Sequence, residues 1–338
     1  MKLLEILKKW RKFPYLENDF IFHPQFDPPP PPEYGKPTID VPSISREYNG
    51  SGFLRIFTLW ALEYCSTKPK DCQGGWVPLK FPFHKLAIKY GAGRNIIEAV
   101  NLRLVASETS IRVPKVYSAF MHEREPYILM ELIDGVSLRD GWSVCTNDEK
   151  DYIILQLKGI FEELRNIPHP MPGAIAAGDM QTLFDPRLRH GSYGFGPFAN
   201  EEDFNNFILC GVHEDSPILT NPETSLDTQT KSEIKEVITR QKMVNHGHKV
   251  CFTHGDVNPG NILIKGGKVV ALIDFELAGF YPEYWEYVNA IIVMSHDEFW
   301  VTEVGQCLTP YPEEFYFEIL RRMKHFSRRG LYRVYPWE

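Results

Sequence analysis

One segment, residues 251–276, constrains the fold of this chain more than any other. Two short apolar runs flank a loop with the sequence His-Gly-Asp-Val-Asn-Pro-Gly-Asn, and a Gly-Gly turn and a third apolar run follow. A glycine pair between short apolar runs is typical of a β-hairpin. We therefore predict adjacent short strands whose ends bring Asp256, Asn261 and Asp274 to one point in space.

These three residue types suit phosphoryl transfer. That reaction needs a group that takes the proton of a substrate hydroxyl, oxygen ligands for Mg²⁺ and a cation on the phosphates. Asp256 can accept the proton, and Asn261 and Asp274 can supply the hard oxygen ligands that Mg²⁺ prefers. The spacing from Asp256 to Asn261 equals that of the kinase catalytic loop, Asp-x-x-x-x-Asn, and an Asp-Phe pair follows one hairpin later.

Together these motifs carry a resemblance to a known family. The His-Gly-Asp motif that ends at Asp256, the asparagine at 261 and the Asp-Phe-Glu motif that begins at Asp274 resemble the aminoglycoside phosphotransferase and choline kinase family of the protein-kinase-like superfamily. The chain is most similar to the large fungal branch of phosphotransferase-like proteins, which residues 278–287 also resemble. The resemblance covers roughly residues 83–320.

The resemblance implies an α+β protein with a bilobal, protein-kinase-like fold. We expect a small N-lobe with an antiparallel sheet plus one helix, and a larger, mainly helical C-lobe. The expected divisions are an N-terminal extension with a proline-rich linker at 1–40, the nucleotide-binding N-lobe at 41–133, and the C-lobe at 134–338, with the catalytic loop and the acceptor site. The length of 338 residues accommodates two lobes.

Two charged residues upstream of this segment, a lysine and a glutamate, are further candidates for the site. Lys89 lies in an alternating stretch that predicts a half-buried strand, and Glu98 lies in a stretch with helical spacing, residues 94–104. The resemblance implies that Lys89 holds the phosphates of ATP and that Glu98 pairs with it, since an unpaired buried charge is costly. Without its context, Lys89 would fit a surface strand better than a phosphate site; Glu98 and the downstream motif favour the functional interpretation.

A second hairpin is predicted between residues 113 and 132, with a polar turn at 122–125. The resemblance places the hinge between the lobes at its end. Backbone groups of Glu131, Leu132 and Ile133 would bind the adenine, with Met130 behind it. The alternative is a plain core strand.

The region from 40 to 83 resembles the family poorly. Residues 53–65 fit a strand or a helix. The only candidates for a glycine loop over the phosphates are Gly50 with Gly52 and the pair at 74–75, and neither matches Gly-x-Gly-x-x-Gly. Turns are the favoured role for both.

Several helices are expected in the C-lobe. The Thr146/Glu149 capping box starts one, and Asn200 caps another that ends at 209. Apolar spacing predicts further helices at 234–238, 281–294 and 312–322. By analogy, Glu286 braces the catalytic loop, although a surface charge is the alternative.

Two regions that connect helices of the C-lobe are predicted to be loops. The Pro- and Gly-rich insert at 167–197 would shape the acceptor pocket, as the resemblance implies. Residues 213–230 are polar and are expected to form a mobile loop.

The N-terminal region contains two features of low complexity. Residues 1–12 have an apolar helical face, which fits packing on the domain better than docking on a membrane surface. The proline run at 28–32 predicts an extended, stiff linker, with an SH3-type ligand as the alternative.

Composition excludes several classes of protein. The net charge of −7 argues against nucleic acid as the main partner, because phosphate binding needs a basic surface. No run approaches the ~20 apolar residues of a membrane span, and charged residues occupy the place of a signal-peptide core. Six scattered cysteines without a Cys-x-x-Cys motif suggest reduced thiols. We expect a cytoplasmic protein.

The departures from protein kinases point to a small-molecule acceptor. Gly255 replaces the arginine that grips a phosphorylated activation loop, Asn258 stands in place of a lysine, and no Ala-Pro-Glu segment follows. Glu276 adds a third carboxylate beside the metal site. We expect transfer of the γ-phosphate of ATP, with Mg²⁺, to a hydroxyl of an unidentified small molecule. The alternatives are a degenerate nucleotide-binding scaffold and, less favoured, a protein kinase.

Overall fold

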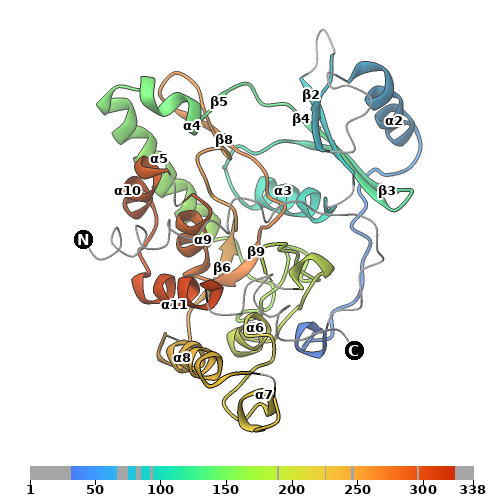
Figure 1. Ribbon diagram of the computed structural model, residues 1–338. Helices are drawn as coiled ribbons and strands as arrows, with labels where there is room; N and C mark the ends of the chain where they lie inside the picture. The colour runs from blue at the N-terminus through green and yellow to red at the C-terminus, as the bar shows by residue number, and fades with distance from the viewer. Residues whose placement is uncertain are drawn as a thin grey trace.

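The computed structural model shows two lobes, a small one built around a sheet and a larger helical one (Figure 1). The expected α+β architecture is confirmed. The structure describes the following residues: 32–66, 75–80, 85–91, 94–188, 190–224, 226–244, 247–294 and 297–323. Residues 1–12 and most of the proline run at 28–32, whose structure was predicted from the sequence, lie outside this described part.

The small lobe contains the expected antiparallel sheet, in the order β1-β2-β4-β3. Its strands are β1 Gly75–Pro78, β2 Leu86–Tyr90, β3 Val116–His122 and β4 Glu125–Glu131. The predicted hairpin is β3–β4. Its two turn residues, Glu123 and Arg124, have φ values of 50° and 67°, as tight hairpin turns require.

Two helices cover the two faces of this sheet. Ala87 in β2 packs with α3 Ile97–Glu108, whereas Ile88 packs in a separate cluster with α2 Phe53–Cys65. The open alternative at residues 53–65 is therefore resolved as a helix. Because side chains alternate along a strand, Lys89 shares the face of Ala87 and points toward α3.

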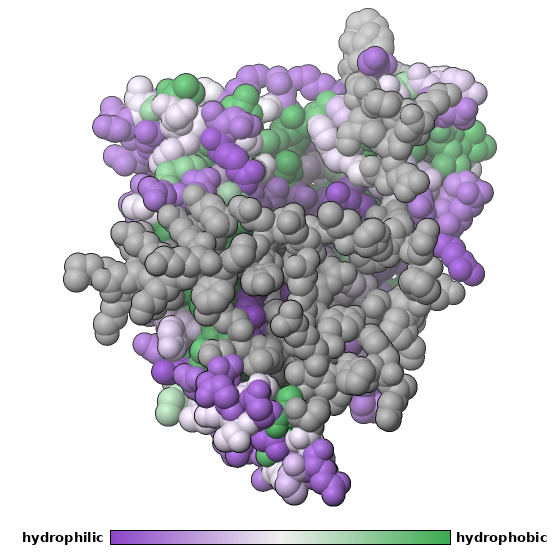
Figure 2. Space-filling view, viewed as in Figure 1, coloured by the Kyte–Doolittle hydropathy of each residue, from purple (hydrophilic) through white to green (hydrophobic). Residues whose placement is uncertain are grey.

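The outer face of α2 carries exposed apolar side chains, including Phe53 at 76% and Ile56 at 69% exposure. Figure 2 shows apolar surface at the edge of the small lobe over this helix.

The catalytic segment in the large lobe forms two separate small sheets. The predicted hairpin is confirmed as β7 Ile262–Ile264 and β8 Val269–Leu272, with β5 Val136–Ser137 on the other edge of β7. The expectation that all strands of the segment are adjacent is wrong. The strand before the loop, β6 Val250–Thr253, pairs with β9 Gly279–Pro282 instead.

This pairing also corrects the predicted helix at 281–294. Its first residues belong to β9, in which all four residues are buried, and α9 begins only at Trp285 and ends at Val293. Pairing with β6 satisfies the backbone of a wholly buried Gly-Phe-Tyr-Pro segment, whereas proline removes one backbone donor and resists a helix interior.

The remaining helices surround this core. They are α4 Leu138–Gly141, α5 Asn147–Arg165, α6 Glu201–Ile208, α7 Pro217–Thr220, α8 Thr228–Val244, α10 Glu298–Cys307 and α11 Pro312–Met323. Within the described residues, short 3-10 turns lie at Glu33–Gly35, Trp142–Val144 and Gly191–Tyr193.

The capping box of α5 and the Asn200 cap of α6 are confirmed. The predicted loop at 213–230 contains α7 and the first turn of α8. None of the described helices has the length and apolar character that a bilayer span requires.

The extended segment at 33–50 crosses both lobes. Thr38 donates a hydrogen bond to Asp203 of α6 over 2.6 Å, and the Tyr48 N–H donates to Ala119 O of β3 over 2.8 Å. We call this segment, residues 33–50, the strap. The domain boundary predicted after residue 40 therefore falls within a continuous segment (Figure 1).

His248 joins three parts of the large lobe. Its Nδ1 lies 2.7 Å from Glu201 Oε1 of α6, and its Nε2 lies 3.1 Å from Glu314 Oε1 of α11. Burial alone would lower the pKa of His248, but the hydrogen bonds and charges of the two glutamates outweigh burial and raise the pKa to about 9. Both ring nitrogens therefore carry protons at neutral pH and donate them to carboxylates.

We expect this imidazolium to stabilise the fold in a pH-dependent way. The unfolded chain has a histidine pKa of about 6.5, so the stabilisation is complete below that value and is lost as pH rises through 9. His248→Gln should lower the free energy of unfolding by about 2 kcal/mol near pH 6 and by much less above about pH 9.5. Urea denaturation at both pH values measures this, and an equal loss at both would contradict it. Tyr311, which contacts the ring, does not interfere, because burial raises its pKa to about 12.

Candidate functional site

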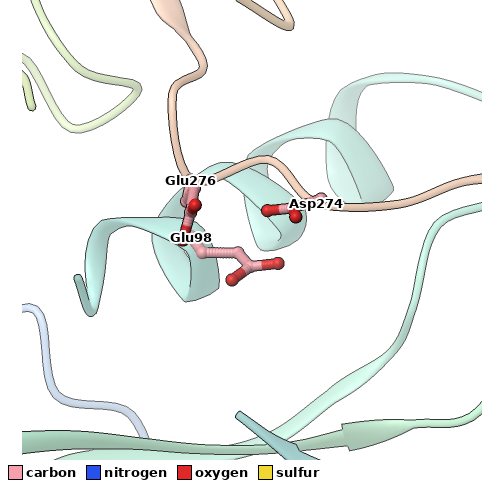
Figure 3. A group of neighbouring side chains, drawn as sticks. All are labelled: Glu98, Asp274 and Glu276. Carbon is pink, nitrogen blue, oxygen red and sulfur yellow. The ribbon is translucent and has the colours of Figure 1, made fainter. Parts of the chain in front are cut away.

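A buried ammonium lies among three carboxylates at the junction of the lobes. Lys89 Nζ is 2.7 Å from Glu98 Oε2, 2.7 Å from Asp274 Oδ1 and 3.0 Å from Glu276 Oε2. The side chain of Lys89 is only 5% exposed. Figure 3 shows the three acids facing one another, Glu98 from α3 and the other two from the loop after β8. The predicted pairing of Lys89 with Glu98 is present.

The charges of this cluster shift one another's pKa values. Burial alone would lower the pKa of Lys89, but Glu98, Asp274 and Glu276 raise it above its usual value. Burial raises the pKa of Glu98 to about 7, against the opposing charge of Lys89. Burial acts in the same direction on Asp274, but the charge and hydrogen bond of Lys89 outweigh it and lower that pKa. The cluster therefore keeps a charged ammonium beside an ionised Asp274.

Asp256 lies in the loop between β6 and β7 and is held from two sides. Its Oδ2 accepts hydrogen bonds from Asn261 Nδ2 over 3.0 Å and from Asn258 Nδ2 over 3.3 Å. Its Oδ1 accepts from Arg187 Nη1 over 3.2 Å. Burial raises the pKa of Asp256 to about 7, and Arg187 opposes that rise. The carboxylate thus has a defined orientation.

The structure brings together the residues that the sequence analysis singled out. Asn261 contacts Asp256 directly, and the Asn261 carbonyl accepts a hydrogen bond from the Ile273 N–H over 3.0 Å. Asp274 is the next residue, with φ of 67°, and reaches Lys89. Both lobes therefore contribute to one site.

Glu286 of α9 holds the catalytic loop through hydrogen bonds, as the analogy suggested. Its carboxylate accepts the N–H groups of His254 over 2.6 Å and of Gly255 over 3.0 Å. The alternative of a surface charge is excluded, because Glu286 is 4% exposed. Gly255 has φ of 79°, and a Cβ there would lie 2.3 Å from Leu277 O, so this position requires glycine.

His254 joins the two halves of the loop. Its Nδ1 accepts the Asp256 N–H over 3.2 Å, and its Nε2 is 3.0 Å from Ile273 O. Because Nδ1 accepts and Nε2 faces a carbonyl, only the neutral ring with a proton on Nε2 fits. Burial lowers the pKa of His254 to about 4, which agrees with that tautomer. His254 therefore has a structural role, because it links the backbone at Asp256 to the backbone at Ile273.

The predicted hinge follows β4, with Met130 buried in the sheet. The Glu131 N–H donates to Lys115 O and the Leu132 N–H donates to Lys85 O, both over 2.9 Å. The Ile133 N–H has no hydrogen-bond partner within the described part of the chain. Of the three backbone donors, it is the one that remains for a ligand.

The candidate glycines Gly52 and Gly75 do not lie in the connection from β1 to β2. Gly52, with φ of 68°, precedes α2, and Gly75 opens β1. Gly74 lies outside the described residues. The connection from β1 to β2, residues 79–85, contains no glycine.

Comparison with known proteins decides the family. A profile described as the phosphotransferase enzyme family matches residues 94–317, which is more than half of the chain. The chain belongs to this phosphotransferase enzyme family. No protein with a curated description matches the sequence at a significant level.

Solved structures support the same fold for this member of the family. The crystal structure of aminoglycoside phosphotransferase APH(4)-Ia has a TM-score of 0.53 at 13% identity, covering 79% of this chain and 87% of that chain. A thermostable mutant of the same protein, in a ternary complex with ADP and hygromycin B, has a TM-score of 0.51 at 13% identity, with 78% and 87% covered. At these identities the likeness shows the fold alone. The kinase-like architecture is thereby confirmed.

The donors of this site fit a divalent cation. Within the described residues, Glu98, Asp274 and Glu276 offer carboxylate oxygens that all lie within 4.8 Å of one another. Asn261 must turn its nitrogen toward Asp256, because it donates there to both the backbone and carboxylate oxygens. Its amide oxygen is then left to act as an acceptor. Hard oxygen donors of this kind suit Mg²⁺.

Two residues of the site escaped the sequence analysis. Asn101 of α3 donates to Phe275 O and Ala278 O over 3.0 and 2.9 Å, so it ties the helix to the loop that carries Asp274. The available signal was its position three residues after Glu98, on the same helical face. The other is Arg187 in the insert, for which spacing gave no signal.

Proposed function

We propose that this phosphotransferase transfers the γ-phosphate of ATP to a hydroxyl group of a small molecule. The observation that carries the proposal is a chain of contacts between the lobes: Asp256 contacts Asn261, the Asn261 carbonyl accepts from the residue before Asp274, and Asp274 contacts Lys89. Phosphoryl transfer requires a proton acceptor, metal ligands and a cation in this arrangement.

Each residue has a proposed role. Asp256 orients the acceptor hydroxyl and takes its proton. Lys89, steadied by Glu98, contacts the phosphates of ATP. Asn261 and Asp274 would hold Mg²⁺, whose charge stabilises the negative charge on the phosphates. Glu276 lies close enough to Asp274 to orient that carboxylate or to join the ligands.

The proposed nucleotide site runs along the hinge. The Ile133 N–H, which has no partner among the described residues, can donate to the adenine. Backbone carbonyls of Glu131 to Ile133 can accept, and Met130 would lie behind the ring. The ADP named in the APH(4)-Ia complex supports nucleotide binding by a protein of this fold. We retain the proposed lobes at 41–133 and 134–338, with the strap crossing both.

A small-molecule acceptor is favoured over a protein. Gly255 cannot grip a phosphorylated loop, and its backbone leaves no room for a side chain. The APH(4)-Ia complex contains hygromycin B, a small molecule, together with ADP, in a protein of the same fold. Aminoglycosides, choline-like amines and sugars are therefore all suitable candidates. We propose a cytoplasmic location, where ATP is available.

One observation favours a second candidate, a nucleotide-binding scaffold. The connection between β1 and β2 has no glycine that would let its backbone approach the phosphates closely.

The two functions are separated by incubating purified protein with labelled Mg²⁺-ATP and a panel of hydroxylated and aminated metabolites. Transfer to a panel member supports the phosphotransferase. A Mg²⁺-dependent thermal shift with ATP, without transfer to any member, supports the scaffold.

A further inference from the structure

Arg187 lies in the insert between α5 and α6, yet its guanidinium reaches the catalytic loop. Nη1 donates to Asp256 Oδ1 over 3.2 Å, and Nη2 donates to Gly255 O over 2.7 Å. The side chain is 5% exposed. A buried arginine with two contacts in the loop is well placed to fix the geometry of that loop.

Asp185 of the same insert holds this arginine through several hydrogen bonds. Asp185 accepts Arg187 Nε over 2.9 Å and Nη2 over 2.7 Å, and it also accepts the Arg187 N–H over 2.9 Å. The Asp185 N–H in turn donates to Gly191 O over 3.1 Å. A Cβ at Gly191 would lie 2.0 Å from Asp185 O, so the turn closes too tightly for any other residue. The guanidinium therefore has little freedom to move.

We propose that Arg187 is a positioning residue for Asp256. Asn261 and Asn258 hold Oδ2, and Arg187 holds Oδ1, so the carboxylate is restrained at both oxygens and cannot rotate about its last bond. The segment that would line the acceptor pocket thereby also orients the group that meets the acceptor hydroxyl. This inference rests on the proposed function, because positioning matters only if Asp256 acts on a substrate.

A purely structural role would be to fasten the insert to the loop, and the chain offers a matched control for it. Arg46 of the strap binds Asp179 of the same insert through Nε over 2.7 Å and Nη2 over 2.9 Å. Within the described part of the chain, neither residue of this second pair contacts Asp256. It shares the bidentate geometry and the insert, but not the contact with the catalytic loop.

The test compares two double variants of the full chain. Asp185→Asn with Arg187→Gln removes both charges of the buried pair together, so that neither member of the pair is left without the other. Asp179→Asn with Arg46→Gln is the control. With labelled Mg²⁺-ATP and an accepted hydroxyl compound, or with water as the acceptor, we expect the first variant to lower kcat by about 10- to 100-fold and to leave the KM for ATP within about 3-fold. The control should keep kcat within about 3-fold.

Arg187→Lys should recover part of the lost kcat, because it keeps the charge near Asp256. The proposal is overturned if the first double variant keeps the kcat of the parent protein, or if the control loses as much.

A second measurement does not depend on turnover. Thermal unfolding of Arg187→Gln, Asp256→Asn and their combination should give non-additive losses of Tm, because the two side chains are in contact. Additive losses would show that the contact is absent and would overturn the inference by themselves. If the parent protein transfers no phosphate but the losses are non-additive, the proposed function fails and the contact stands as a structural one.

Discussion

Asp256→Asn should lower kcat for phosphate transfer by about 10²- to 10⁴-fold, the usual contribution of a positioned base. The amide cannot take the proton of the acceptor hydroxyl. The fold should persist, because Arg187 keeps Asp185 as its bidentate partner and Glu286 still holds the loop. Steady-state kinetics with saturating Mg²⁺-ATP measure the loss, and thermal unfolding checks the fold.

The matched control for this variant is Asp148→Asn, an exposed aspartate in the first turn of α5. It makes the same chemical change outside the candidate site and should leave kcat within about 2-fold. Turnover by Asp256→Asn equal to that of the control would remove the proposed role of Asp256.

Lys89→Met should have the second large effect, on both stability and catalysis. It leaves Glu98, Asp274 and Glu276 close together without the ammonium that contacts all three. Breaking a buried ion pair from one side costs about 3–5 kcal/mol, because the remaining charge is uncompensated. We expect a loss of that size in the free energy of unfolding in the absence of Mg²⁺, together with the loss of phosphate transfer.

Adding Glu98→Gln to Lys89→Met separates the two effects. This double variant has one buried negative charge fewer, so it should recover part of the stability but none of the phosphate transfer. Urea denaturation and kinetics on the same preparations test both statements. A Lys89→Met protein with the stability and turnover of the parent would show that the ammonium has neither role.

The parts of the site that could be predicted from sequence are those encoded locally. Alternation in β2 placed Lys89 on a defined face, and the Gly-Gly turn fixed the β7–β8 hairpin that carries Asn261 and precedes Asp274. The spacing within the loop then determined that Asp256 and Asn261 lie close together. Each of these rests on a pattern of fewer than about ten residues.

The parts that escaped prediction depend on contacts between distant segments. β6 pairs with β9 rather than with its neighbours in sequence, and no local pattern distinguishes those partners. Arg187 reaches Asp256 across 69 positions, and Asn101 reaches Phe275 across 174. Residues 53–65 are apolar on several faces, so periodicity alone could not distinguish a helix from a strand.

The most direct test of the whole account is the dependence of ATP binding on Mg²⁺, measured by calorimetric titration of the parent protein and of Asp274→Asn. The account predicts that Mg²⁺ strengthens ATP binding by the parent protein, and that Asp274→Asn, which loses a carboxylate ligand, loses most of this gain. ATP binding that is equally strong with and without Mg²⁺ in both proteins, or that is absent from the parent protein, would contradict it.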